Sequence, residues 1–86
     1  MQVSLEISMY PLQADYIPPI QSFIDKLNTH SNIKVKTNSM STQIFGAYDH
    51  IMEALKVSML HAFGDTNKVA MVMKMINSNL DYEYGA

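Results

Sequence analysis

The sequence contains no cysteine and no arginine, and its three glycines, Gly46, Gly64 and Gly85, stand apart from one another. Without cysteine there is no disulfide, no thiolate metal site and no cysteine nucleophile, a composition that fits the cytoplasm. Isolated glycines exclude a glycine-rich loop that cradles phosphate.

Positive charge and long apolar runs are also scarce. The six lysines are scattered and the net charge is −2, so neither a nucleic acid nor an anionic membrane is expected as a partner. No apolar run approaches the roughly 20 residues of a membrane-spanning helix, and the chain opens on a strand pattern rather than a signal peptide. We therefore expect a soluble, cytoplasmic protein.

Hydrophobic residues, by contrast, are abundant: they make up 48% of the 86 residues, against 16% charged. A chain of this length supports one domain with a small core. An apolar surplus on so small a domain is most simply explained by oligomerisation through an uncovered apolar face.

The clearest local pattern is the alternation over residues 3–11. Val3, Leu5, Ile7 and Met9 are apolar, and between them stand Ser4, Glu6, Ser8 and Tyr10. A period of two indicates a strand with one apolar and one polar face, and we expect this strand to be central in the sheet.

Helix and strand patterns follow one another along the rest of the chain. Helical spacing predicts a helix over residues 19–29, with Asp15 as its N-cap, and a second helix that follows Asp49 as N-cap and ends at Gly64. Alternation or short apolar runs predict strands at residues 33–38, 42–47 and 68–76, the first two of which form a hairpin.

The order βαββαβ predicts an α+β, ferredoxin-like fold: a four-stranded antiparallel sheet in the order 4-1-3-2 with both helices on one face. We expect residues 1–78 to form a single domain and residues 79–86 a C-terminal tail. The sheet face away from the helices, with Tyr10 and Phe45, is the expected oligomer surface. The last strand is apolar on both faces, which also points to a second subunit.

Few residues favour catalysis or metal binding. His30, His50 and His61 lack the spacing of a metal site, and no histidine is predicted beside the serines of the strands. We therefore predict no metal site, no cofactor and no catalytic residues.

Hydrogen-bonding groups instead gather at strand ends. Glu6 supplies a carboxylate, and the uncharged groups are those of Ser8, Tyr10, Asn38, Ser39, Ser41, Thr42 and Gln43. Hydroxyls and amides can bind the edge of a heterocycle, a carboxylate can balance a cation, and Tyr10 or Phe45 can stack on a ring. The alternative is that the turn residues only cap the backbone and that the eight methionines only fill core and interface.

Three segments resemble the small thiamine-binding proteins related to YkoF, a thiamine/hydroxymethylpyrimidine-binding protein. They are V-S-L-E-I-S-M-Y-P-L at residues 3–12, S-M-S-T-Q-I-F-G at residues 39–46 and V-M-K-M-I at residues 72–76. The resemblance implies a ferredoxin-like fold, association through the sheets, and binding without chemical conversion. It supports as ligand-binding residues Glu6, Ser8, Tyr10, Ser39, Met40, Ser41 and Thr42. Acidic residues and arginine are common in the family where this chain has Asn77, Ser78 and Asn79.

The leading hypothesis is therefore a non-catalytic binding protein for thiamine or its hydroxymethylpyrimidine moiety, assembled as a homodimer or homotetramer. The ligand would lie near the open sheet face at a subunit interface, with Glu6 as its counter-charge. One alternative is a structural or regulatory oligomerisation module without such a ligand. Another is a small ferredoxin-like enzyme, for which spacing alone supplies no acid–base pair.

Overall fold

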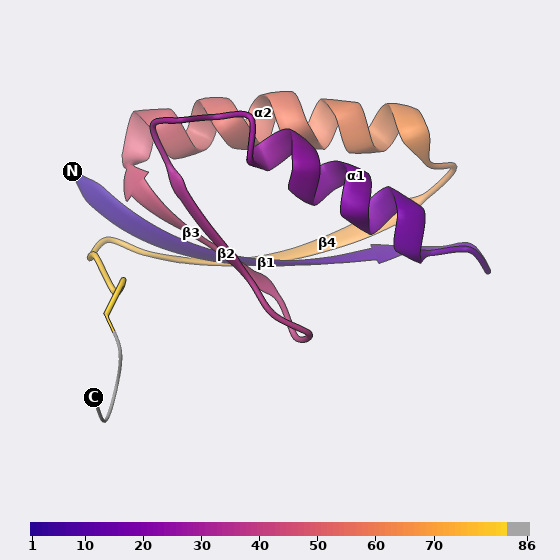
Figure 1. Ribbon diagram of the computed structural model, residues 1–86, viewed down its shortest axis with the longest axis horizontal. Helices are drawn as coiled ribbons and strands as arrows, with labels where there is room; N and C mark the ends of the chain where they lie inside the picture. Colours follow the sequence, from indigo (N-terminus) through magenta and orange to yellow (C-terminus); the bar gives the residue numbers. More distant parts are fainter. Residues whose placement is uncertain (83–86) are drawn as a thin grey trace.

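The computed structural model describes residues 1–82, and all six predicted elements are present (Figure 1). They are β1 (Gln2–Pro11), α1 (Ile17–Leu27), β2 (Lys34–Thr37), β3 (Thr42–Ala47), α2 (Tyr48–Asp65) and β4 (Val69–Ile76). The strands form one antiparallel sheet in the order β2-β3-β1-β4. This order is the predicted one read from the other edge, and the ferredoxin-like α+β fold is confirmed.

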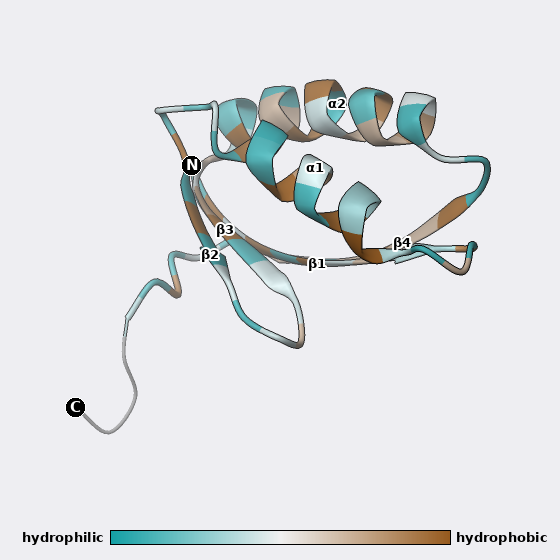
Figure 2. Cartoon of the chain, turned by 45° about the vertical axis from the view of Figure 1, so that its right-hand side comes forward, coloured by the Kyte–Doolittle hydropathy of each residue, from teal (hydrophilic) through white to brown (hydrophobic). Residues whose placement is uncertain are grey.

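Both helices lie on one side of the sheet, as the side view in Figure 2 shows. The core forms between the helices and the apolar face of β1, where Val3, Leu5 and Ile7 are almost completely buried. Phe23 of α1 and Ile51 of α2 pack against this face. β1 is central because the period-two pattern gives it one continuous apolar face for both helices to cover.

Two predicted helix caps are wrong. α1 begins at Ile17 after Tyr16 and α2 begins at Tyr48 after Ala47, and neither cap residue makes a side-chain hydrogen bond. At α1, prolines in the first turn need no N–H partner, so the helix starts without the carboxylate of Asp15. At α2, Asp49 lies one residue inside the helix, in its first turn.

The predicted end of the second helix is also displaced. Gly64 is the penultimate residue of α2, which ends at Asp65 and is followed by Thr66 in an extended conformation. The hydroxyl of Thr66 donates to the carbonyl of Ala62 at 3.0 Å. This bond satisfies one carbonyl of the last turn, so the helix end is capped by a side chain rather than by a glycine.

The face of the sheet away from the helices, here called the open face, carries the alternate residues of each strand. Register places Ser4, Glu6 and Ser8 of β1 on it beside Lys74 and Val72 of β4. β4 is an edge strand, and Val72 is 61% exposed in the single chain. Across the described residues, no helix is both long and apolar enough to cross a membrane.

Candidate functional site

β1 has a free edge at its C-terminal end. Its pairing with β3 stops at Ile7 opposite Thr42, whereas its pairing with β4 continues to Pro11 opposite Val69. Residues 8–11 therefore have a neighbouring strand on one side only. The sheet has a notch here, because β3 begins at Thr42, opposite Ile7, whereas β1 continues to Pro11.

A cavity of about 330 Å³ occupies this notch. Five consecutive residues of β1, residues 7–11, line it. Side chains of a strand alternate between faces, so five in a row can border one cavity only along the strand edge. The main-chain groups of that edge are therefore within reach of a molecule in the cavity, as at any strand edge that lacks a partner.

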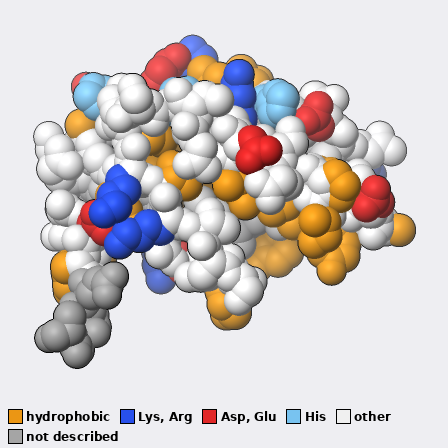
Figure 3. Space-filling view, in the orientation of Figure 1, with side chains coloured by type: hydrophobic (Ala, Val, Ile, Leu, Met, Phe, Trp, Pro, Cys, Tyr) orange, Lys and Arg blue, Asp and Glu red, His pale blue; other side chains and the backbone are white. Residues whose placement is uncertain are grey.

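The start of α1 and the β2–β3 turn complete the walls. Tyr16, Ile20 and Phe23 supply the apolar side from the helix. Hydrophobic side chains gather on the surface at this end of the molecule, below the start of α1 (Figure 3). Six of the seven predicted ligand-binding residues line the cavity: Ser8, Tyr10, Ser39, Met40, Ser41 and Thr42.

The turn that carries three of these residues, Ser39, Met40 and Ser41, is held by Asn38. Its side-chain oxygen accepts hydrogen bonds from the backbone N–H groups of Met40, at 2.8 Å, and Ser41, at 3.1 Å. Its own N–H donates to the carbonyl of Ser41. An asparagine that bonds the backbone two residues ahead is a common turn device, and it fixes the side of the cavity opposite β1.

Thr42 lies deeper, at the start of β3. Its side chain is buried, and its hydroxyl lies 3.1 Å from the hydroxyl of Thr37 on the paired strand. A hydroxyl pair uses one donor between two oxygens, so one O–H remains for a further acceptor. Tyr10 and Met40, in contrast, are largely exposed and lie at the rim.

Glu6 is the one predicted site residue that does not line the cavity. It lies on the open face, where its carboxylate accepts a hydrogen bond of 2.8 Å from the Ser41 hydroxyl and lies 3.3 Å from Nζ of Lys74. The Ser41 hydrogen bond first, and then Lys74, lower the pKa of the Glu6 carboxyl. Glu6 therefore carries a negative charge near neutral pH, one side chain removed from the cavity.

Within residues 1–82, tyrosine is the only ionisable residue type that lines the cavity. Its polar groups are the hydroxyls of serine, threonine and tyrosine, the amide of Asn38, and the edge of β1. Such a site can hydrogen-bond and stack, but it offers no counter-charge to a phosphate.

A serine, a histidine and an aspartate meet elsewhere, between the two helices. The Ser22 hydroxyl lies 2.8 Å from Nε2 of His61 and 3.1 Å from Oδ2 of Asp65. The same Nε2 is 3.3 Å from Oδ2 of Asp65. In a nucleophilic triad the acid and the nucleophile bond opposite ring nitrogens, so this cluster lacks that relay. Among residues 1–82, no three histidine, aspartate or glutamate side chains form a metal-binding group.

The sequence-based predictions did not include three further residues that line the cavity. Tyr16 precedes α1, Phe23 belongs to α1, and Thr37 is the last residue of β2. Phe23 is buried in the core. Its second role at the cavity depends on how α1 crosses β1, and no local pattern reports that.

Fold and cavity together define a ferredoxin-like domain with a polar-rimmed pocket at the end of its sheet. The chain belongs to the YKOF-related family, whose model matches residues 2–79. The Bacillus subtilis (strain 168) protein YkoF, named as a candidate HMP/thiamine-binding protein, is 36% identical over 64 residues. That alignment covers 74% of this chain and 32% of YkoF, so the chain spans about a third of that relative.

Solved structures give the same fold. A hypothetical protein from Methanocaldococcus jannaschii is 27% identical with a TM-score of 0.78, covering 95% of this chain and 84% of that one. A Thermotoga maritima protein described as a candidate thiamine biosynthesis or salvage protein is 16% identical with a TM-score of 0.80, covering 91% and 85%. At 16% identity the second likeness shows the fold alone.

Proposed function

We propose that this protein binds thiamine or its hydroxymethylpyrimidine moiety without converting it, in the cavity between β1, α1 and the β2–β3 turn. The observation that carries the proposal is the convergence of six of the seven predicted residues on one cavity. Membership of the YKOF-related family and the name of the Bacillus subtilis relative support the choice of ligand.

The chemistry of the walls suits an aminopyrimidine. Such a ring has amino donors and ring-nitrogen acceptors on its edge, which match the main-chain groups of a free strand edge and neighbouring hydroxyls. Its faces are apolar and can lie against Phe23 and the rim tyrosines. The volume of about 330 Å³ lies at the small end of ligand sites and accommodates a compact ring system.

The role of Glu6 in the proposal is electrostatic and indirect. Its carboxylate lies 2.8 Å from the hydroxyl of Ser41, a residue that lines the cavity, so it can favour a cation there without touching the pyrimidine. Thiamine carries a positive charge on its thiazolium ring, whereas hydroxymethylpyrimidine is neutral. In this proposal the ligand lies at the end of the sheet next to α1, and Glu6 acts on it from the open face, where it is bonded to Ser41.

Calorimetric titration of the purified protein with hydroxymethylpyrimidine and with thiamine tests the proposal. We expect saturable binding of at least one of them, and Thr42→Val should weaken it about tenfold, because a hydroxyl in the buried wall loses its hydrogen bond. Ser22→Ala removes a hydroxyl that lies between the two helices and outside the cavity, so it serves as the control and should leave affinity unchanged. Absence of heat with either compound from a folded protein would remove the proposal.

The alternative, an oligomerisation module without this ligand, is favoured by the exposed apolar residues of β4. It predicts a stable oligomer that binds neither compound. The titration combined with the measured molecular mass of the protein therefore separates the two functions.

A further inference from the structure

The charge on one substituent of the pyrimidine ring distinguishes the forms of the proposed ligand. In free hydroxymethylpyrimidine this substituent is a neutral alcohol, and in thiamine the same ring position leads to the thiazolium cation. As a phosphate ester the substituent carries a charge of about −1.5 to −2 near neutral pH. A compact cavity that holds the ring also borders this substituent, so the walls of the cavity decide which form binds.

No cationic side chain borders the cavity. The sequence contains no arginine, and its six lysines and three histidines all lie within residues 1–82, which the structure describes. None of these side chains lines the cavity. A phosphate group there would have no side chain with which to form the charge-assisted hydrogen bonds that hold phosphate in proteins.

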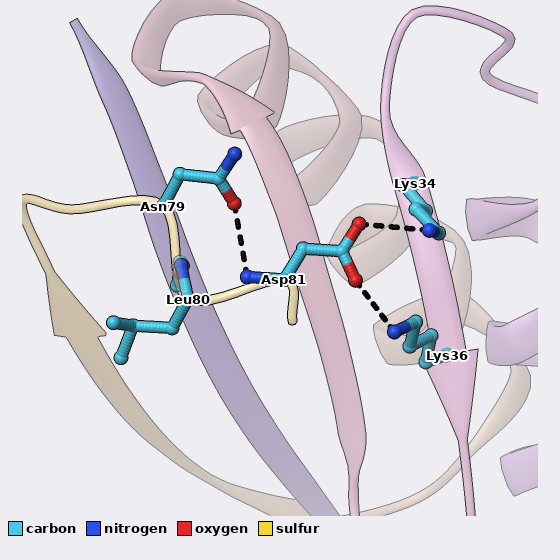
Figure 4. A network of polar contacts seen from close by, with 6 residues as sticks. Lys34, Lys36, Asn79, Leu80 and Asp81 are labelled. Carbon is cyan, nitrogen blue, oxygen red and sulfur yellow. Dashed lines mark hydrogen bonds and ion pairs between the residues drawn. The ribbon is translucent and has the colours of Figure 1, made fainter. Parts of the chain in front are cut away.

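Two of the lysines are paired on the open face. Asp81 has one carboxylate oxygen 2.8 Å from Nζ of Lys34 and the other 2.5 Å from Nζ of Lys36 (Figure 4). Hydrogen bonds from Lys34 and then Lys36 lower the pKa of Asp81, so its carboxylate stays ionised near neutral pH. The segment that carries Asp81 is bound to the sheet by Ser4, whose hydroxyl accepts the backbone N–H of Leu80 at 2.8 Å. The charges of both lysines are therefore already balanced outside the cavity.

The donors of the β2–β3 turn are occupied as well. The backbone N–H groups of Met40 and Ser41 both donate to the side-chain oxygen of Asn38. The Ser41 hydroxyl donates its only hydrogen to the carboxylate of Glu6. Successive N–H groups of a turn can form a concave anion site, but here oxygen atoms of the chain itself take these donors. The charge behind this wall is that of Glu6, which is negative.

The N-terminus of α1, which lies beside the cavity, lacks two backbone donors. Tyr16, directly before the helix, and Ile20, near its start, both line the cavity. A helix N-terminus binds anions through its first four N–H groups, which have no partner within the helix. Pro18 and Pro19 stand in the first turn of α1 and have no N–H, so this end of the helix is a poor anion site.

From these observations we infer that the cavity discriminates by charge at the hydroxymethyl position: it binds the free alcohol and rejects its phosphate ester. The inference rests on the proposed function, because it names the form of the pyrimidine that the same site takes. The donors that remain are neutral, namely hydroxyls, the Asn38 amide and the edge of β1, so they can bind an alcohol but cannot balance a dianion. Removing such a charge from water without a partner is unfavourable.

Calorimetric titration of the full-length chain with hydroxymethylpyrimidine and with its phosphate ester, at one pH and ionic strength, measures this discrimination. We expect the ester to bind at least about thirtyfold more weakly, because the charged hydrogen bonds that would offset its desolvation are missing. Met40→Lys places a cation at the exposed rim and should reduce the ratio of the two dissociation constants at least about threefold, and less at high salt. Leu60→Lys makes the same change of charge at an exposed position of α2 outside the cavity and should leave the ratio unchanged.

Equal or tighter binding of the phosphate ester would overturn the inference while the pyrimidine-binding function still held. A ratio that Met40→Lys does not change would overturn it too, since the discrimination would then depend on size rather than charge. Should Met40→Lys unfold, Ser39→Lys in the same exposed turn is held to the same expectation.

Failure of the proposed function has a different signature. If neither compound binds, the proposed function falls, and NMR titration with inorganic phosphate tests the exclusion of anions by itself. We expect the backbone amide signals of residues 38–42 to stay unchanged as phosphate is added. Saturable shifts of these signals would reveal an anion site in the cavity and overturn the inference.

Discussion

Ser41 connects the two faces of the sheet at its notch. Ser41 lines the cavity, and its hydroxyl donates to the carboxylate of Glu6 on the open face. A ligand that takes the Ser41 hydroxyl for itself would therefore release Glu6 from its main hydrogen bond. We therefore expect the charge of Glu6 and the occupancy of the cavity to be coupled through this one side chain.

We expect Glu6→Gln to weaken binding of thiamine more than binding of hydroxymethylpyrimidine. The substitution removes the negative charge but keeps a hydrogen-bond acceptor for Ser41, so only the cationic ligand loses an attraction. Calorimetry with both ligands measures the difference, and Glu53→Gln on α2 is the control for net charge. Equal losses for the two ligands would contradict the role of Glu6 as counter-charge.

Ser41→Ala should raise the pKa of Glu6 towards its ordinary value of 4.5, because the Ser41 hydrogen bond is the largest cause of its lowering. A side-chain NMR titration of the carboxyl carbon follows this change directly. Lys74→Gln should also raise this pKa, because Lys74 lowers it both through a hydrogen bond and through its charge. An unchanged pKa in the Ser41→Ala variant would show that Lys74, rather than the hydroxyl, governs Glu6.

At the scale of elements, α2 carries an unsatisfied polar group. Ser58 is completely buried, and its hydroxyl has no hydrogen-bond partner among the described residues. It lies on the buried side of the helix with Ala54 and Leu55. Burying a hydroxyl without a partner is unfavourable, and serine is also a weaker helix former than alanine.

Ser58→Ala should therefore stabilise the protein by about 1 kcal/mol, which corresponds to a rise in Tm of roughly 4–8 °C for a domain of this size. Thermal unfolding monitored by circular dichroism gives the shift. Glu53→Ala, at an exposed position of the same helix, controls for the effect of a change to alanine on helix propensity. A lower Tm for Ser58→Ala would mean that the hydroxyl has a favourable contact in solution.

The elements themselves follow from local patterns, and their ends do not. The alternation in β1 and the spacing in α1 predicted both elements, because each buries one face against the same core. The caps at Asp15 and Asp49 were wrong because proline and tertiary packing start these helices without a side-chain cap.

Across the whole molecule, acid should weaken the fold at two places on the open face. The pKa values of Glu6 and Asp81 are lowered from ordinary values of 4.5 and 3.8, so the unfolded chain binds more protons than the folded one at acidic pH. Their contribution is present above these ordinary values and is lost as pH falls through the lower folded values.

Urea unfolding at pH 6 and at pH 3 should show this loss, which is small because both pairs lie at the protein surface, where solvent screens them. The double variant Glu6→Gln/Asp81→Asn should depend less on pH over that interval. An unchanged pH dependence in the double variant would assign acid sensitivity to other carboxylates.

The edge strand β4 exposes an apolar surface that is suited to oligomerisation. β4 has an unpaired edge, and its apolar residues Val72, Met73 and Ile76 are exposed in the single chain. We expect the protein to form a homodimer or homotetramer, with a Tm that rises with concentration. Val72→Lys on the open face should lower the mass in sedimentation without unfolding the chain, whereas Lys68→Gln just before β4 should not.

The sequence by itself determined the order of elements, the apolar face of β1 and the polar residues at the strand ends, because alternation and spacing are local. Only the tertiary structure decided that Ser8 and Tyr10 share one cavity with Ser41 and Thr42, and that Glu6 stays outside it. The reason is register. β3 starts opposite Ile7, so β1 extends beyond the start of β3, and this offset depends on how the two strands pair rather than on either sequence alone. The path of residues 78–81 over Ser4 and the lysines of β2 is likewise a long-range contact, which no pattern within ten residues encodes.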